Sequence, residues 1–218
     1  MVLLHGYGMS ASVYRSVGDA LSTNHRVIIP DLPGFGKSDK VGKASFEEFA
    51  ALLQGFLREI GVSTATLIAH SMGGGVAIEF ARLFPEEVAK LVLVDSVGSP
   101  IKRSTLGWAY SAIRKTWHGL YRLRVSLEIV SAFVLNCLRR PVWMLRTFRM
   151  TADCDLLGVL GRLKVRIRVV WAAEDEYFPL SACSNICRAS SVKSILIDAG
   201  HDWIILEPTA PLVLHQLL

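Results

Sequence analysis

The stretch that decides the fold is Ala69-His70-Ser71-Met72-Gly73. Residues 66–69 predict a short buried strand, and residues 72–83 predict a helix directly after the serine. A serine at this junction suits a sharp strand-to-helix turn that raises its hydroxyl above the edge of a sheet. The free N–H groups at the start of the helix would favour negative charge there. A serine that only caps the helix is the alternative that this pentapeptide leaves open.

Two further polar side chains follow predicted strands. Asp175 comes shortly after the apolar run at residues 167–171, and His201 comes after the run at residues 194–197. Parallel strands bring their carboxyl ends to one edge of a sheet, which is where ligands bind in such folds. Ser71, Asp175 and His201 are therefore expected at the same edge. Their order along the chain, Ser then Asp then His, is the order found in hydrolases that place the serine on this kind of turn.

The other apolar runs alternate with longer amphipathic stretches. Residues 45–60 have the pattern of a helix that is capped by Ser45, with Glu48 three positions further on to complete the cap. The alternation predicts an α/β fold with a mainly parallel sheet of about six strands and helices on both faces. The predicted strands lie at residues 2–4, 26–30, 66–69, 90–94, 167–171 and 194–197.

Residues 99–150 interrupt this alternation between the fourth and fifth predicted strands. They are rich in aromatic residues and look helical, so we predict a helical cap or lid insertion here and an α/β core formed by residues 1–98 and 151–218. Residues 100–150 contain ten Lys or Arg residues and one acid, a local charge of +9 in a chain of net charge +5. This charge favours peripheral contact with an anionic membrane through residues 100–150, although many basic faces are only solvated.

The composition excludes several classes of protein. With 51% hydrophobic and 20% charged residues in 218 positions, the chain is expected to be globular rather than disordered. The longest apolar run, residues 125–138, is shorter than the ~18–20 residues of a spanning helix and contains Glu128 and Asn136. The first residues lack the basic region of a signal peptide, and the four cysteines lack the spacing of a metal site. We therefore expect a cytoplasmic protein, with peripheral membrane contact left open, and no cofactor, metal or nucleic-acid partner.

Motifs elsewhere in the chain accompany the serine turn. His5-Gly6-Tyr7-Gly8 follows the first predicted strand, Asp31-Leu32-Pro33-Gly34-Phe35-Gly36 follows the second, and Gly200-His201 precedes Glu207-Pro208. Together with the serine turn and Asp175, these motifs make the chain resemble the α/β-hydrolase fold family, in its esterase, lipase and carbon–carbon hydrolase group. The resemblance runs from residue 2 to about residue 212, and residues 99–150 lie where the family has its variable cap.

The sequence departs from the family pattern in two places. Ala69 replaces the first glycine of the serine turn, which is a mild change because alanine is also small. The family normally has two antiparallel strands before the His-Gly loop, so the resemblance places the start of this sequence at the third strand. Residues 27–29 would then form the edge of the sheet, and an apolar edge strand predicts a homodimer or aggregation.

The resemblance implies a role for each residue of the site. Ser71 would be the nucleophile, His201 the general base and Asp175 the acid that orients the histidine. The backbone N–H groups of Tyr7 and Met72 would form the oxyanion hole. General chemistry supports the roles of Ser71, His201 and Asp175. A serine hydroxyl needs an imidazole to take its proton, and the imidazole needs a carboxylate to fix its tautomer.

Two neighbouring side chains remain alternatives for these roles. His70 adjoins the serine and could be the base, and Asp95 follows the fourth strand and could orient His201. A histidine base of ordinary pKa predicts an acid limb near ~6.5–7 in the pH profile of activity.

The serine also narrows the reaction. It argues against dehalogenases and epoxide hydrolases, which are the branches of the family that use an aspartate nucleophile. The first expectation is a serine hydrolase that cleaves an ester, thioester or lactone of a small apolar acyl substrate through an acyl-enzyme. Carbon–carbon bond hydrolysis on the same fold is one alternative, and a non-catalytic α/β-hydrolase-like binding protein is another.

Overall fold

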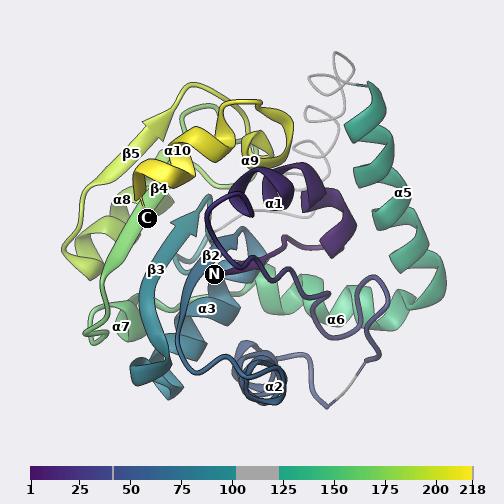
Figure 1. The fold of residues 1–218 in the computed structure, drawn as a ribbon, viewed down its shortest axis with the longest axis horizontal. Helices are drawn as coiled ribbons and strands as arrows, with labels where there is room; N and C mark the ends of the chain where they lie inside the picture. The colour runs from purple at the N-terminus through teal and green to yellow at the C-terminus, as the bar shows by residue number, and fades with distance from the viewer. Residues whose placement is uncertain (41, 102–122, 218) are drawn as a thin grey trace.

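A computed structural model describes residues 1–40, 42–101 and 123–217 of the chain (Figure 1). Within these residues a sheet of five parallel strands forms the centre, in the order β1-β2-β3-β4-β5. Because each strand is parallel to its neighbour, the chain must cross a face of the sheet between consecutive strands. The strands are β1 (Val2–Leu4), β2 (Ala65–His70), β3 (Val88–Val94), β4 (Ile167–Ala172) and β5 (Ser194–Ile197).

Helices cover both faces of the sheet (Figure 1). One face packs against α1 (Arg15–Leu21), α9 (Trp203–Leu206) and α10 (Ala210–Leu217). The opposite face packs against α2 (Phe46–Glu59), α3 (Met72–Leu83), α7 (Leu157–Leu160) and α8 (Leu180–Ser190). Short 3-10 helices lie at Ala11–Tyr14 and Pro85–Glu87.

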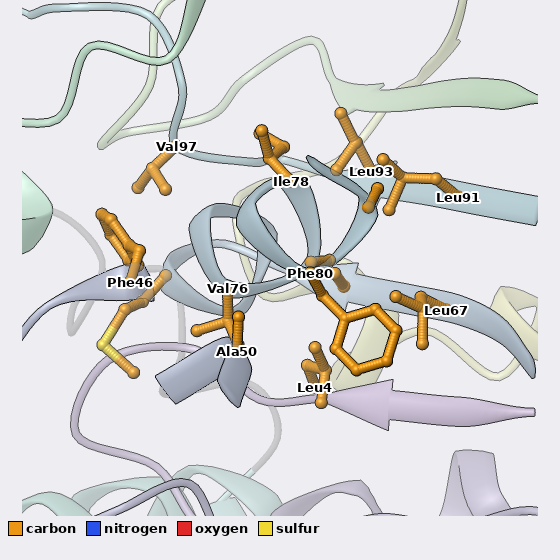
Figure 2. Close-up of a cluster of buried hydrophobic side chains, with 14 of the residues drawn as sticks. Leu4, Phe46, Ala50, Leu67, Val76, Ile78, Phe80, Leu91, Leu93 and Val97 are labelled. Carbon is orange, nitrogen blue, oxygen red and sulfur yellow. The ribbon is translucent and has the colours of Figure 1, made fainter. Parts of the chain in front are cut away.

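Successive side chains of a strand enter two different cores. Leu4 joins the core under α2 and α3, whereas Leu3 joins the core under α1, α9 and α10. Leu93 and Val92 of β3 divide in the same way. Figure 2 shows the first of these cores, where strand side chains meet Val76 and its neighbours on α3. Strands that are buried on both faces explain why these runs are apolar throughout instead of alternating.

The predicted start of the helix at residues 45–60 is confirmed. The helix is α2, and Ser45 Oγ accepts a hydrogen bond from the N–H of Glu48 at 3.2 Å. The predicted helix at residues 72–83 is α3, which begins directly after Ser71. Ser45 thus satisfies one of the first free N–H groups of α2, whereas the first free N–H groups of α3 lie next to Ser71.

The prediction of a strand at residues 26–30 is wrong, which leaves five strands in the described residues. Ile28 makes a single parallel bridge to Val2, with hydrogen bonds from Leu3 N–H to Ile28 O at 2.9 Å and from Ile28 N–H to Met1 O at 3.0 Å. The neighbouring strand β1 has only three residues, so it offers few partners. Pro30 also lacks an N–H and cannot extend the pairing.

In the segment between β3 and β4, α7 is preceded by two longer described helices, α5 (Leu123–Arg139) and α6 (Pro141–Ala152). They agree with the helical character predicted for residues 99–150, although predictions for residues 102–122 lie outside the described residues. Pro141 stands at the first position of α6, where its missing N–H costs no helical hydrogen bond. None of the helices in residues 1–40, 42–101 and 123–217 combines the length and apolar character needed to cross a bilayer.

Candidate active site

Ser71 sits on a strained turn between β2 and α3. Its backbone has φ 53° and ψ −119°, a conformation that non-glycine residues rarely adopt and that costs roughly 1–3 kcal/mol. The turn is held because Ser71 N–H donates to Val94 O at 3.0 Å, while Ser71 O accepts from the N–H of Gly74 and of Val97. The serine is therefore fixed by β3 and by its own helix at the carboxyl end of the sheet.

Small residues allow the loop after β1 to approach this turn closely. A Cβ atom on Gly73 would lie 2.7 Å from Leu4 O and 2.9 Å from His5 O. A Cβ atom on Gly6 would lie 3.3 Å from the Cβ of Ser71. The loop formed by residues 5–9 thus packs directly against the serine turn, which explains why glycine occupies these positions.

His201 and Asp175 form a buried pair. His201 Nδ1 lies 2.7 Å from Asp175 Oδ2, and the two side chains are 5% and 1% exposed. The other oxygen of Asp175 accepts hydrogen bonds from the backbone N–H groups of Tyr177 at 2.7 Å and Phe178 at 2.8 Å. Because a carboxylate only accepts hydrogen bonds, it selects the tautomer with the proton on Nδ1 and leaves Nε2 able to take a proton.

The surroundings of His201 raise its pKa to about 9. Burial alone would lower this pKa, but the charge and hydrogen bond of Asp175 favour the imidazolium more strongly. The nearby carboxyl groups of Asp202 and Asp95 act in the same direction. The histidine is therefore a stronger base than an exposed imidazole.

The structure does not support His70 as the base. His70 is completely buried, its Nε2 lies 3.0 Å from His201 O, and its Nδ1 lies 2.6 Å from the hydroxyl of Tyr14. A carbonyl oxygen only accepts, so Nε2 carries the proton and donates it to His201 O. His70 thus ties the serine turn to the loop that carries His201.

Asp95 does not orient His201 either. Its Oδ1 accepts a hydrogen bond from Ala172 N–H at 2.6 Å, and its Oδ2 accepts one from Trp203 Nε1 at 2.7 Å. Burial, followed by the charge of Asp175, raises the pKa of Asp95 well above its ordinary value. Asp95 joins the end of β4 to the helix that follows His201, and Asp175 is the carboxylate paired with the histidine.

The two predicted oxyanion donors flank the serine turn. Met72 is the first residue of α3, so its N–H has no partner within the helix. Within the described part of the chain, Tyr7 N–H donates no hydrogen bond. Tyr7 belongs to the loop that packs against Ser71 through Gly6. Both N–H groups are thus available to stabilise negative charge.

His70, Asp95 and His201 also place ligand-type atoms within 4.8 Å of one another. Such a group can hold a metal only if its lone pairs are free. The hydrogen bonds just described already engage both ring nitrogens of His70, both carboxylate oxygens of Asp95 and Nδ1 of His201, which leaves only Nε2 of His201 among these atoms. The arrangement fits a network that positions the loops of the site better than it fits a metal centre.

Three residues of the site were not predicted from the sequence. The Tyr14 hydroxyl accepts a hydrogen bond from Gly6 N–H at 3.1 Å and forms another with His70 Nδ1. A carboxylate oxygen of Glu176 accepts from His201 N–H at 3.2 Å. Asn136 donates to a carbonyl oxygen of the loop after β1. Glu176 adjoins Asp175, and Asn136 is a lone amide in an apolar run, so each carried a weak signal. Tyr14 carried none, because it lies in a stretch without a motif.

The comparison with known sequences identifies relatives of this chain. A family model described as alpha/beta hydrolase fold matches residues 1–127. A 2-hydroxy-6-oxononadienedioate/2-hydroxy-6-oxononatrienedioate hydrolase from Paraburkholderia phymatum is 32% identical over 214 residues, which cover 83% of this chain and 72% of the relative. A 2-hydroxy-6-oxo-6-phenylhexa-2,4-dienoate hydrolase from Burkholderia cepacia is 27% identical over 208 residues, with the same coverage of each chain.

The fold is also found in solved structures. A thermophilic esterase from Thermogutta terrifontis matches with a TM-score of 0.79 at 23% identity, over 99% of this chain and 88% of the esterase. At this level of identity the likeness shows the fold alone.

Proposed function

Because the chain belongs to the α/β-hydrolase fold family, we propose that it is a serine hydrolase that cleaves the carbon–carbon bond beside the ketone of a 2-hydroxy-6-oxodienoate. The observation that carries this proposal is the similarity, over most of the chain, to the two hydrolases named above. Their names share the 2-hydroxy-6-oxodienoate unit and differ beyond carbon 6. These relatives favour the carbon–carbon alternative over the ester, thioester or lactone that the sequence alone put first.

The substrate class supplies the electron sink that such a cleavage needs. When the proton of the 2-hydroxyl moves to carbon 5, the dienol becomes a 2-oxo compound with a saturated carbon 5. Carbon 5 can then leave carbon 6 with the bonding electron pair, because that pair is conjugated with the 2-oxo group. Water adds in total: its hydroxyl ends on carbon 6 as a carboxylic acid, and the other fragment gains one hydrogen, because carbon 5 keeps the proton from the 2-hydroxyl and the 2-oxygen is protonated again.

The site offers groups for the steps that follow this proton shift. His201 Nε2 takes the proton of Ser71, whose Oγ attacks carbon 6 of the ketone. The N–H groups of Tyr7 and Met72 stabilise the resulting oxyanion, each contributing roughly 3–4 kcal/mol. When the oxyanion collapses, the bond from carbon 5 to carbon 6 breaks, and His201 gives its proton to the 2-oxygen of the departing dienolate, which becomes 2-hydroxypenta-2,4-dienoate. A water molecule activated by His201 then hydrolyses the acyl-Ser71 ester.

A direct comparison of substrates tests this proposal. The chain is assayed with 2-hydroxy-6-oxo-6-phenylhexa-2,4-dienoate and with p-nitrophenyl esters of graded chain length. We expect kcat/KM for the dienoate to exceed that for every ester by ~10-fold or more, with benzoate and 2-hydroxypenta-2,4-dienoate formed in equal amounts.

The Ser71→Ala variant is the control, and it should lose both activities. Faster cleavage of an ester than of the dienoate would return the assignment to an esterase. A folded protein that turns over none of these substrates, and in which Ser71 does not react with a fluorophosphonate, would instead be the binding protein considered from the sequence.

A further inference from the structure

Helix α5 reaches the loop of residues 5–9 through one buried amide. Asn136 is 4% exposed and stands in the part of α5 that faces the core. Its Nδ2 donates to Gly8 O at 3.0 Å and to Met9 O at 3.3 Å. Its Oδ1 accepts from Gly36 N–H at 3.1 Å. One side chain thus joins α5 to two loops that are 100 and 128 residues away in sequence.

Only one orientation of this amide satisfies its partners. The carbonyl oxygens of Gly8 and Met9 need donors, whereas the N–H of Gly36 needs an acceptor. The NH2 group must therefore face the loop after β1, and the oxygen must face the turn at Gly36. A buried amide with these partners is costly to disturb, because each partner it loses becomes an unsatisfied buried polar group.

The same loop is held on its other side by aromatic contacts. The ring of Tyr7 lies 6.1 Å from the ring of Phe133 on α5 and 5.8 Å from that of Phe148 on α6. The Tyr7 hydroxyl donates to Met144 O on α6 at 2.9 Å. Burial raises the pKa of this hydroxyl, so it keeps the proton that it donates. Side-chain and backbone contacts from α5 and α6 therefore surround Tyr7, whose N–H is one of the two predicted oxyanion donors.

The loop has little stiffness of its own. Gly6 and Gly8 leave its backbone free to adopt several conformations, and Gly8 has φ +74°. Other backbone hydrogen bonds of the loop involve Gly6. Its N–H donates to the Tyr14 hydroxyl, and its carbonyl oxygen accepts from Met9 N–H and lies 2.9 Å from His5 Nδ1. Asn136 therefore supplies the side-chain anchor for the carbonyls after Tyr7.

We propose that Asn136 is a positioning residue, through which α5 sets the direction of the Tyr7 N–H toward the oxyanion. This inference rests on the proposed function, in which that N–H stabilises the transition state. As a consequence, the packing of α5 on the core is coupled to the oxyanion hole through this single side chain.

Two variants test the hydrogen bonds of the Asn136 amide: one changes only its donor side, and the other removes both sides. Asn136→Asp keeps an oxygen for Gly36 N–H but places a second acceptor against Gly8 O and Met9 O. Asn136→Ala removes both sets of bonds. Removing an oxyanion donor lowers the rate by ~10²–10³-fold, and a donor that is only displaced should lower it less. We therefore expect kcat to fall ~10–100-fold in both variants, while KM changes less than ~3-fold.

Trp143→Phe is the matched control. It removes the hydrogen bond from Trp143 Nε1 to Pro33 O at 2.9 Å, which also joins α6 to the core but does not touch residues 5–9. This variant should melt at a lower temperature than the wild type and keep its kcat. The melting temperature of every variant is measured beside its kinetics, so that rates are compared only between folded proteins.

The rate at which a fluorophosphonate labels Ser71 is the second measurement, because this reaction also builds negative charge in the oxyanion hole and does not depend on the natural substrate. Labelling should slow by ~10-fold or more in both Asn136 variants. Labelling and kcat within ~2-fold of the wild type in these variants, or an equal loss in Trp143→Phe, would overturn the role of Asn136. If the wild type labels but does not cleave the dienoate, only the substrate assignment fails. If the wild type does not label at all, both proposals fail.

Discussion

The chemistry of the site depends on three side chains with different environments. We expect Ser71→Ala and His201→Ala to reduce kcat by ~10³-fold or more without unfolding the protein, because each removes a group that exchanges the proton or forms the bond. Asp175→Asn should cost almost as much, since Asp175 fixes the tautomer of His201 through the 2.7 Å contact. Steady-state kinetics and thermal melting of the three variants check this expectation.

Asp95→Asn is the informative comparison. Asp95 bonds Ala172 N–H and Trp203 and does not contact the Nδ1 proton of His201, so its replacement should lower the melting temperature more than kcat. A larger loss of kcat in Asp95→Asn than in Asp175→Asn would show that the acid has been assigned to the wrong carboxylate.

The pH profile should carry the signature of the His201–Asp175 pair. The imidazole must be neutral to accept the proton, so kcat/KM falls as the pH decreases through the pKa of His201. We expect this acid limb to lie above the ordinary value and toward about 9, instead of the ~6.5–7 predicted for an unperturbed histidine. The same pair stabilises the fold fully below pH 6.5, and this contribution is lost as the pH rises through about 9.

Asp175→Asn tests the cause of that shift. Removing the carboxylate charge should move the acid limb of the remaining activity downward, since burial then acts on His201 with less opposition. An acid limb near 6.5 in the wild type, or no movement in the variant, would contradict the described pair.

At this scale the sequence predicted where Ser71, Asp175 and His201 lie, because each follows a strand and the carboxyl ends of parallel strands meet. It assigned the acid to Asp175 and kept Asp95 as an alternative, because both follow strands. The sequence also did not predict hydrogen-bond partners that lie in distant segments of the chain. Tyr14 and His70 are 56 residues apart, and no local pattern records such a contact.

The elements differ in how well their sequences describe them. The helices α2 and α3 begin where capping and turn residues predict. The predicted strand at residues 26–30 fails because pairing needs a partner of sufficient length, and the three residues of β1 supply one bridge. An apolar run specifies burial, and its neighbours decide whether it becomes a strand.

The outer face of α5 and α6 has an unusual composition. The side of α5 opposite Ile129 and Asn136 is apolar although it is exposed, and Leu138 has 75% of its surface accessible. Arg139, Arg146 and Arg149 are exposed on the same pair of helices. We propose that this face contacts an anionic membrane surface, because apolar side chains flanked by arginines suit the headgroup region. The apolar side chains are Leu127, Val130, Val134 and Leu138 on α5, with Val142 and Leu145 on α6.

Sedimentation with vesicles tests this contact. The wild type should bind vesicles that contain phosphatidylserine more than neutral vesicles and should be released by salt, because each Lys or Arg near an anionic surface contributes about 1 kcal/mol. Leu138→Glu should weaken binding, whereas Leu212→Glu, at another exposed leucine on α10, should not. Equal binding to both kinds of vesicle, or no effect of salt, would refute the proposal.

For the whole molecule, the alternation of apolar runs and amphipathic stretches predicted a parallel sheet between two layers of helices, and the structure confirms it. Leu3 and Leu4 illustrate why this was possible, since adjacent apolar residues of one strand serve two cores. The arrangement of α5 and α6 was beyond prediction, because it depends on Asn136, Trp143 and Tyr7 finding partners in loops far along the chain.

Among residues 1–40, 42–101 and 123–217, no strand pairs with the outer side of residues 27–29, and this edge predicts self-association. Ile28 directs its N–H and C=O toward β1, so the N–H and C=O of Val27 and Ile29 point away from the sheet. Such groups can pair with a second copy of the chain, and we expect a dimer fraction that grows with concentration. Ile29→Pro removes one outward donor and should reduce this fraction in size-exclusion chromatography with light scattering, with circular dichroism as the check on folding. A monomer at every concentration would show that the edge is not used.

The central claim is that Ser71 is a nucleophile activated by His201 at the carboxyl edge of the sheet. Its most direct test is to treat the folded protein with a fluorophosphonate and identify the modified peptide by mass spectrometry. We predict a single adduct on Ser71 that is absent in Ser71→Ala and that forms at least ~10²-fold more slowly in His201→Ala. An adduct on another residue, or no adduct on a protein shown to be folded, would contradict the account.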